Sequence, residues 1–243
     1  MKKFIFDVDG TLTPSRKSMD IMFMSFMLEF CDKHEVYLVT GSNREKTLEQ
    51  ISYGLYNKCK RVYNCAGNDV YEQEELVYRT PWELPDDAKE FLLEELKQST
   101  FPIRTGTHIE KRSGCVNFSI LGRGAIFEER EVYKEWDKDN QERIGIAKRF
   151  NQKFPELYAF VGGETGVDIS AKGNDKGQII RDFSSDDEIH FFGDRMDVNG
   201  NDYPLAKAVQ ERCGKTYNVK DWEETRLWVN RFSSSYASGV RYN

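Results

Sequence analysis

The sequence predicts an α/β protein: a parallel-sheet core with an α+β domain inserted into it. Two observations carry this prediction. Short apolar runs alternate with helical patterns up to about residue 80 and again after residue 175. Between them the pattern changes to helix, hairpin, helix, hairpin, which is typical of an antiparallel sheet with helices. We therefore expect a discontinuous core, residues 1–80 and 175–243, and a smaller inserted domain, residues 81–174.

The first part of the core alternates strands and helices. Residues 3–8 form a short apolar run that ends at Gly10, the pattern of a buried strand, and residues 35–42 and 60–67 repeat it. Helices are expected in two stretches between these strands, because apolar residues recur there at helical spacing. These helices span 18–31 and 44–55.

The inserted domain has two expected helices and four expected strands. The first helix spans 86–98, and the second, long and charged, spans 128–153. Ser113-Gly114 joins the first two strands as a plausible hairpin turn. The four strands are 107–113, 115–122, 158–163 and 166–171.

After Lys176 the core pattern resumes with a helix over 176–183, a strand over 188–193 and a polar loop over 194–202. From residue 222 onward the composition predicts a flexible tail.

Composition excludes several classes of protein. No apolar run approaches the length of about 18 residues that a membrane helix needs, and the N-terminal segment resembles a strand instead of a signal peptide. The net charge of −6 argues against a nucleic-acid partner. The 5 cysteines are scattered and the 3 histidines have no metal-ligand spacing, so a reducing, cytoplasmic location fits best.

Polar residues follow three of the expected core strands. In a parallel sheet the carboxyl ends of strands meet at one edge, where open α/β folds bind ligands. Side chains from the sequences DVDGT, TGS and GDRMDVNGND can therefore converge despite their separation in the chain. The converging residues are Asp7, Asp9, Thr40, Ser42, Asp194 and Asp202.

Such a cluster of carboxylates predicts phosphoryl chemistry with Mg²⁺, because carboxylates repel one another unless a cation or protons neutralise them. Asp7 is the candidate nucleophile that becomes phosphorylated, and Asp9 the candidate acid/base. Thr40, Ser42 and Lys176 are candidates to orient the phosphoryl oxygens.

Each short motif alone has a structural explanation. A DxD sequence usually lies in a solvated turn, TGS is an ordinary turn after a strand, and a lone lysine is by default a surface residue. The sequence DxDGT directly after an apolar strand is far more restrictive, and the matching loops after later strands favour a catalytic site.

FDVDGTLT resembles the first motif of the haloacid dehalogenase (HAD) superfamily, and the closer resemblance is to the eukaryotic-type phosphomannomutases. It extends from Phe4 to about Asp202 and implies an HAD-like Rossmannoid core with a cap domain. Four stretches carry it: FDVDGTLTPSR, GTHIEKRSGCVNFSILGRGAIFEER, GGETGVDISAKGNDKG and HFFGDRMDVNGND.

The resemblance implies roles for residues of the core. Asp7 would be the nucleophile and Asp9 the acid/base, while Asp7, the backbone carbonyl of Asp9 and Asp194 would hold Mg²⁺. Asp202 is a further candidate metal ligand, because it lies in one of the polar loops that follow the core strands. Lys176 would be the phosphate-site lysine, and Arg16 would orient bound substrate.

The resemblance also implies a sugar-phosphate site in the inserted domain. Arg112, Arg123 and Arg130 would grip the distal phosphate of a hexose phosphate, since guanidinium groups suit bidentate phosphate binding. Asp168 would bind sugar hydroxyls. A hexose 1,6-bisphosphate activator and a homodimer formed through the cap follow from the resemblance alone.

The sequence departs from the family at three places. Gly166 replaces a serine that contacts phosphate, NCAGNDV replaces a glutamate-asparagine-glycine loop, and Thr40 replaces a glycine. Three hypotheses therefore stand: a mutase that interconverts mannose 6-phosphate and mannose 1-phosphate, a sugar-phosphate phosphatase, and a non-catalytic sugar-phosphate sensor. The retained arginines favour the mutase, Thr40 and Gly166 the phosphatase, and the intact carboxylates argue against the sensor.

Overall fold

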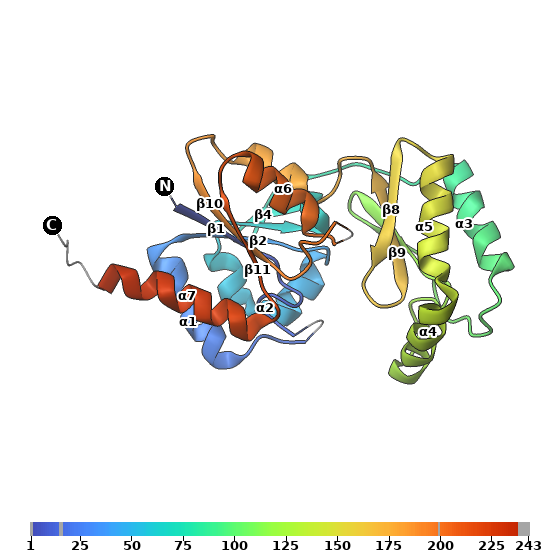
Figure 1. The fold of residues 1–243 in the computed structure, drawn as a ribbon, viewed down its shortest axis with the longest axis horizontal. Helices are drawn as coiled ribbons and strands as arrows, with labels where there is room; N and C mark the ends of the chain where they lie inside the picture. Colours follow the sequence, from blue (N-terminus) through green and yellow to red (C-terminus); the bar gives the residue numbers. More distant parts are fainter. Residues whose placement is uncertain (1, 15–16, 199, 238–243) are drawn as a thin grey trace. The chain divides into compact units, whose positions relative to one another are not determined.

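The computed structural model describes residues 2–14, 17–198 and 200–237, with side chains up to residue 233. The chain forms two compact units (Figure 1). Unit 1 comprises Met1–Tyr78 and Asp175–Asn243, and unit 2 comprises Arg79–Asn174. Among the described residues, no helix is both long enough and apolar enough to cross a membrane.

Unit 1 is built on a mixed sheet with strand order β11-β10-β1-β2-β3-β4-β5. The strands from β11 to β3 are parallel, as predicted, because helical segments connect them along the chain. The antiparallel pairing of β4 with β3 was not predicted. The strands are β1 (Lys2–Phe6), β2 (Glu35–Val39), β3 (Arg61–Asn64), β4 (Asp69–Glu72), β5 (Glu75–Arg79), β10 (Glu188–Gly193) and β11 (Lys215–Asn218).

Helices cover both faces of this sheet (Figure 1). The expected helix over 176–183 is a short 3-10 segment, η2, and a second such segment, η1, follows β3. The helical elements of unit 1 are α1 (Ile21–Lys33), α2 (Arg44–Lys58), η1 (Cys65–Gly67), η2 (Lys176–Asp182), α6 (Tyr203–Glu211) and α7 (Trp222–Ala237).

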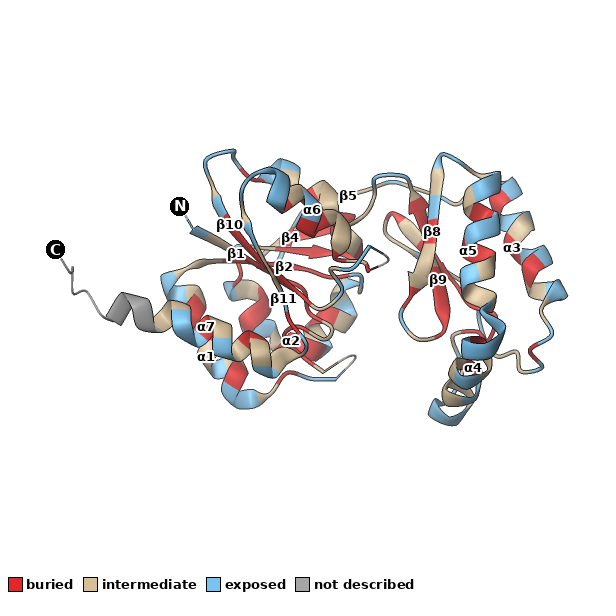
Figure 2. Cartoon of the chain, in the orientation of Figure 1, coloured by how far each residue is buried: buried red, intermediate tan, exposed pale blue. Residues whose placement is uncertain are grey.

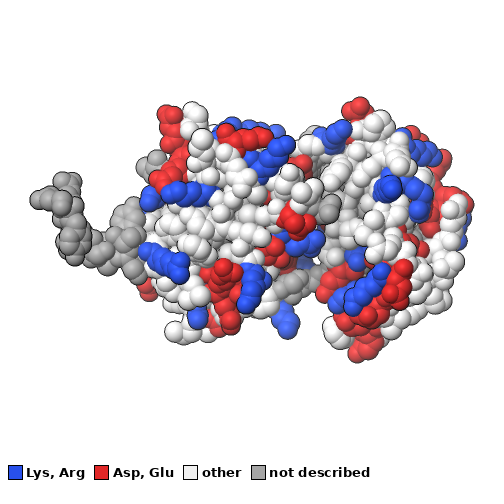
Figure 3. Space-filling model, in the orientation of Figure 1, with Lys and Arg blue, Asp and Glu red and all other residues white. Residues whose placement is uncertain are grey.

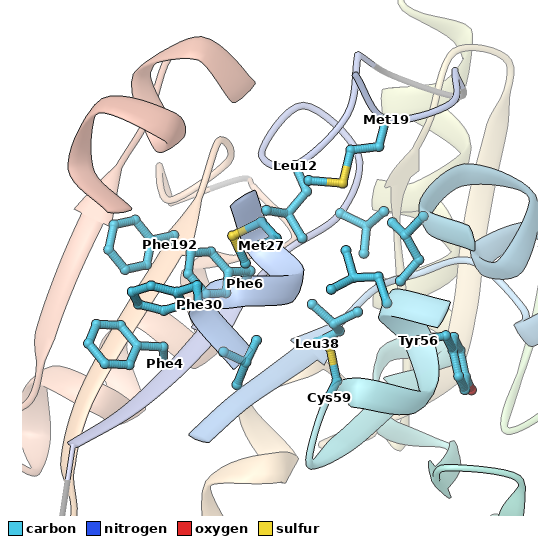
Figure 4. Packing of buried hydrophobic residues seen from close by; sticks show 14 of the residues in the cluster. Phe4, Phe6, Leu12, Met19, Met27, Phe30, Leu38, Tyr56, Cys59 and Phe192 are labelled. Carbon is cyan, nitrogen blue, oxygen red and sulfur yellow. The ribbon is translucent and has the colours of Figure 1, made fainter. Parts of the chain in front are cut away.

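Strand β1 is buried on both faces, so its side chains enter two different clusters. Phe4 and Phe6 pack with Phe30 of α1 and Phe192 of β10 on one face (Figure 4). Ile5 packs into the cluster on the opposite face. The Phe6 and Phe192 rings stack with centroids 4.8 Å apart. This double burial fixes β1, and the polar residues that follow it, at the centre of the sheet.

The prediction of a flexible tail from residue 222 is wrong for the described residues. They form helix α7, whose Val229 is fully buried and whose Trp222 and Trp228 pack against the cluster around Phe4. The Phe232 ring lies 5.1 Å from the Phe4 ring, edge to face. The serine-rich composition of this segment does not indicate a helix with one apolar face, and this face packs against the core. Residues 238–243 lie outside the described residues.

Unit 2 is an antiparallel sheet with strand order β6-β7-β9-β8 and helices against one face (Figure 1). The hairpin predicted at Ser113-Gly114 is confirmed, since Arg112 pairs with Cys115. In unit 2 the buried residues lie on the strands and on the helix faces that pack against them (Figure 2). The elements are α3 (Asp86–Gln98), β6 (Ile109–Arg112), β7 (Cys115–Phe118), α4 (Phe127–Asn140), α5 (Glu142–Lys153), β8 (Leu157–Gly162) and β9 (Gly166–Ala171).

Acidic and basic side chains are interspersed over the face of the molecule seen in Figure 3. On α4, Lys134 pairs with Glu131 and Lys138 pairs with Glu135, each one turn apart. Ion pairs at this spacing stabilise the surface of a helix modestly.

The long helix predicted over 128–153 is two helices, α4 and α5. They meet at Gln141, which is left-handed at φ 52° and ψ 30°. The Asp137 carboxylate accepts hydrogen bonds from Arg143 N at 3.0 Å and Arg143 Nε at 2.7 Å, so it caps the second helix. No glycine or proline marks this position, which is why the helical pattern continues through it in the sequence.

Gln141→Gly is expected to stabilise the protein by about 1 kcal/mol, because a non-glycine residue in the left-handed region costs roughly that much. The midpoint and slope of urea denaturation measure the change. Lys148→Gly, at an exposed position in the middle of α5, is the matched control and should destabilise by a similar amount. A destabilised Gln141→Gly variant would contradict the expectation.

Candidate active site

Three strands of unit 1 deliver polar residues to one edge of the sheet. Asp7 directly follows β1, Thr40 directly follows β2, and Asp194 directly follows β10. The register places Phe6 opposite both Leu38 and Phe192, so the three strands end at the same level. Asp7 N donates to the Phe192 carbonyl at 2.9 Å, which continues the ladder by one residue.

Asp7, Asp194 and Asp202 form an acidic cluster in which carboxylate oxygens lie within 4.8 Å of one another. Lys176, almost fully buried, lies among them. Its Nζ donates to Asp7 Oδ1 at 2.5 Å and to Asp202 Oδ1 at 2.7 Å. Two glycines make room for these carboxylates. A Cβ at Gly10, where φ is +84°, would lie 2.4 Å from Asp194 Oδ2, and one at Gly193 would lie 2.6 Å from Asp202 Oδ2.

The electrostatics of this cluster suit a hard cation. Burial raises the pKa of Asp7 well above its usual value, and although Lys176 lowers it, Asp202 and Asp194 raise it further. Burial and Asp202 raise the pKa of Asp194 to about 6. Burial lowers the pKa of Lys176, but Asp202 and Asp7 outweigh this effect and raise it. The cluster thus holds three carboxyl groups and one ammonium group. The carboxyl groups offer only oxygen ligands and outnumber the ammonium group, a combination that fits Mg²⁺.

Asp9, two residues after Asp7, belongs to a second group of side chains. Its Oδ1 accepts from Gln50 Nε2 at 2.9 Å, and its Oδ2 accepts from Ser42 Oγ at 3.4 Å. Thr40 is buried, and its Oγ1 accepts from Ser42 N at 3.0 Å, so Thr40 shapes the loop that carries Ser42. Gln50 was not among the predicted site residues, because no motif marks it and 41 residues separate it from Asp9.

In unit 2, the predicted arginines divide into two sets. Arg112 and Arg123 both donate to Glu110 Oε2, each through Nε and Nη2, at distances from 2.6 to 3.0 Å. Arg130 instead donates to Glu164 Oε2 at 3.2 Å. Glu110 was not predicted, although its position two residues before Arg112 on a strand, on the same side of the sheet, is a signal that could have indicated it.

Asp168 lies beside Arg112 on the same sheet. Asn117, its cross-strand partner, donates from Nδ2 to Asp168 Oδ1 at 2.6 Å, and Arg112 Nη1 lies 3.5 Å from the same oxygen. A Cβ at Gly166 would lie 2.5 Å from Asn117 Nδ2, so a serine at this position would displace Asn117. Arg16, the remaining predicted substrate residue, lies outside the described residues.

Asp194 gives the metal-free protein a specific pH dependence. Its pKa in the folded protein, about 6, lies above the ordinary value of 3.8, so its contribution to stability is present below that ordinary value and is lost as pH rises to 6. In EDTA, Asp194→Asn is expected to match the wild-type Tm at about pH 4 and exceed it at about pH 7. Thermal melts across this pH range measure the difference in Tm between the variant and the wild type. A difference in Tm that does not change with pH would contradict this expectation.

Solved structures share this fold. A haloacid dehalogenase-like hydrolase from Bacteroides thetaiotaomicron superposes with a TM-score of 0.62 at 13% identity, over 95% of this chain and 99% of that one. A trehalose-6-phosphate phosphatase related protein gives a TM-score of 0.57 at 16% identity, over 98% and 100% of the two chains. The fold class, α/β with an HAD-like core and a separate antiparallel sheet, is therefore confirmed.

Sequence comparison then identifies the family. The model of the eukaryotic phosphomannomutase family matches residues 23–232. A phosphomannomutase from Saccharomyces cerevisiae is 33% identical over 218 residues, 86% of this chain and 85% of the relative. One from Dendrobium officinale is 32% identical over 225 residues, 89% of each. The chain belongs to the eukaryotic phosphomannomutase family, which confirms the resemblance found in the sequence.

Proposed function

We propose that this protein is a phosphomannomutase that interconverts mannose 6-phosphate and mannose 1-phosphate through a phosphorylated Asp7. The observation that carries the proposal is the buried Asp7, placed at a strand end with Lys176 and two further carboxylates, in a chain of this family. A carboxylate in such a setting can attack a phosphorus atom, because the neighbouring ammonium group offsets the negative charge of the phosphoryl group.

In the first half-reaction, an oxygen of Asp7 forms a bond to phosphorus while the bond from that phosphorus to the sugar oxygen of a hexose 1,6-bisphosphate breaks, which leaves a hexose monophosphate. Asp9 gives a proton to the departing oxygen. In the second half-reaction, Asp9 takes a proton from the free hydroxyl of a hexose monophosphate, whose oxygen attacks phosphorus and frees Asp7, so that a hexose 1,6-bisphosphate forms again. Lys176 orients the phosphoryl oxygens, as would Ser42. A hexose 1,6-bisphosphate would supply the first phosphoryl group as activator.

Asp7, Asp194 and Asp202, with the backbone carbonyl of Asp9, would hold Mg²⁺, which supplies charge neutralisation to the phosphoryl oxygens. The excess of carboxylates over ammonium groups in the cluster supports this assignment.

Arg112 and Arg123 would bind the distal phosphate, Arg130 and Arg16 would assist, and Asp168 would bind sugar hydroxyls. The convergence of Arg112 and Arg123 on Glu110 supports a shared anion site, because both guanidinium groups are already held close together. We extend the proposal to a homodimer in the cytoplasm. Exposed apolar residues at the start of α4 in unit 2, Ile126 and Phe127, support an interface there.

Arg123→Gln is expected to raise KM for mannose 1-phosphate by about 10- to 100-fold, since a hydrogen bond to a charged group contributes roughly 1.5–3 kcal/mol. KM for 4-nitrophenyl phosphate, which has no distal phosphate or sugar, should stay unchanged. Arg149→Gln is the matched control, because Arg149 pairs with Glu95 elsewhere in unit 2. Equal effects of both variants on mannose 1-phosphate would contradict the assignment.

The function is tested by supplying mannose 1-phosphate, Mg²⁺ and a catalytic amount of hexose 1,6-bisphosphate, then measuring mannose 6-phosphate and free phosphate. Mannose 6-phosphate without stoichiometric free phosphate is the expected result. Free phosphate alone would overturn the proposal in favour of a phosphatase. Absence of turnover with any hexose phosphate would favour a sensor.

A further inference from the structure

Helix α2 contains a break that the sequence does not signal. Ser52 has φ 66° and ψ 152° within the helix. Almost only glycine adopts this region of backbone conformation, and such strain tends to accompany function. The helix restarts at once, because Ser52 Oγ accepts from Leu55 N at 3.5 Å and so caps the next turn.

The break lies two residues after Gln50, and it allows Gln50 to make contacts outside the helix. The Gln50 carbonyl accepts a hydrogen bond from outside the helix, from Met19 N at 2.8 Å. Its side chain, 3% exposed, reaches the loop after β1. There Nε2 donates to Asp9 Oδ1 at 2.9 Å and to Thr13 Oγ1 at 3.3 Å.

The orientation of this amide group is chemically determined. Turning it over would place Gln50 Oε1 against the Asp9 carboxylate, where two acceptors repel each other. In the observed orientation Oε1 is buried with no hydrogen-bond partner among the described residues, a penalty that the Nε2 contact with Asp9 must outweigh. Gln50 is therefore held for the hydrogen bond it donates.

We propose that Gln50 is a positioning residue for Asp9, an inference that rests on the proposed acid/base role of Asp9. By donating to Oδ1, Gln50 leaves the proton of Asp9 on Oδ2, the oxygen that Ser42 Oγ contacts at 3.4 Å. In the first half-reaction that proton passes from Oδ2 to the departing substrate oxygen, as the bond from phosphorus to that oxygen breaks and the bond to Asp7 forms. The break at Ser52 places the amide group where it can do this.

The leaving group distinguishes this role from a structural one. A sugar oxygen needs a proton as it departs, whereas 4-nitrophenolate departs without one. Gln50→Met, which keeps the volume and removes the donor, is expected to slow phosphorylation of the enzyme by hexose 1,6-bisphosphate about 10- to 100-fold. The rate with 4-nitrophenyl phosphate should change by less than about threefold, and KM for either substrate should stay unchanged.

Thr47→Val is the matched control. Thr47 is buried on the same helix and donates to Asn64 Oδ1, so its loss is expected to lower Tm without changing the ratio of the two rates. Equal slowing of both substrates by Gln50→Met, or the same change of ratio in Thr47→Val, would overturn the proposal.

The contact can also be tested without any activity, which separates this inference from the proposed function. The Gln50 side-chain amide protons are expected to exchange slowly with solvent in the wild type and to lose that protection in Asp9→Ala. Unchanged protection in Asp9→Ala would overturn the inference even in an active enzyme. Wild-type inactivity towards hexose phosphates would instead overturn the proposed function, and the exchange result would then decide the inference by itself.

Discussion

Asp7→Asn is expected to abolish phosphotransfer, with a loss of at least about 10⁴-fold in kcat, because an amide oxygen is a poor nucleophile and no phosphorylated intermediate can form. Initial rates with mannose 1-phosphate and with 4-nitrophenyl phosphate measure this. Both should fall together, since the same nucleophile serves both substrates.

The Asp7→Asn variant should remain folded. Lys176 keeps its contact with Asp202 at 2.7 Å, so the buried ammonium group is not left without a carboxylate. Asp186→Asn, in an exposed loop before β10, is the matched control and should leave the rate unchanged. An Asp7→Asn variant that retains a tenth of the wild-type rate would show that another residue is the nucleophile.

Lys176→Met is expected to destabilise the protein by about 3–5 kcal/mol at neutral pH without Mg²⁺, because it leaves buried carboxylates with no ammonium group between them. Lys176 is 1% exposed, and both of its carboxylate partners, Asp7 and Asp202, are buried. The free energy of unfolding in urea measures the change.

The loss of stability in Lys176→Met should depend on pH and on whether the partner carboxylate of Asp202 is present. Without the ammonium group, the pKa of Asp7 in the folded state rises further above its value in the unfolded chain, so the variant is least destabilised at low pH and loses stability as pH rises. Lys176→Met combined with Asp202→Asn should recover part of the stability. A single variant as stable as the wild type at neutral pH in EDTA would contradict this account of the cluster.

The strand ends were predictable because they depend on a simple rule. DVDGT, TGS and GDRMDVNGND follow apolar strands, parallel strands end at one edge, and the structure brings Asp7, Asp194 and Asp202 together there. The hairpin at Ser113-Gly114 and strand β10 were predictable for similar reasons of local pattern.

What the sequence did not reveal depends on contacts between distant residues. Gln50 reaches Asp9 across 41 residues and through a strained Ser52 that no sequence rule would place there. The break at Gln141 depends on Asp137 and Arg143. Helix α7 is stabilised by the aromatic surface around Phe4, which a composition of serine and polar residues does not suggest.

The central claim, that Asp7 carries the phosphoryl group between the two ends of the sugar, is tested most directly by trapping the phosphorylated protein. The enzyme would be mixed with hexose 1,6-bisphosphate and Mg²⁺, quenched in acid within one turnover, digested and examined by mass spectrometry. A phosphoryl group on Asp7 that disappears on addition of mannose 1-phosphate is the predicted result. Phosphotransfer with no phosphoryl group on Asp7, or with one on another residue, would contradict it.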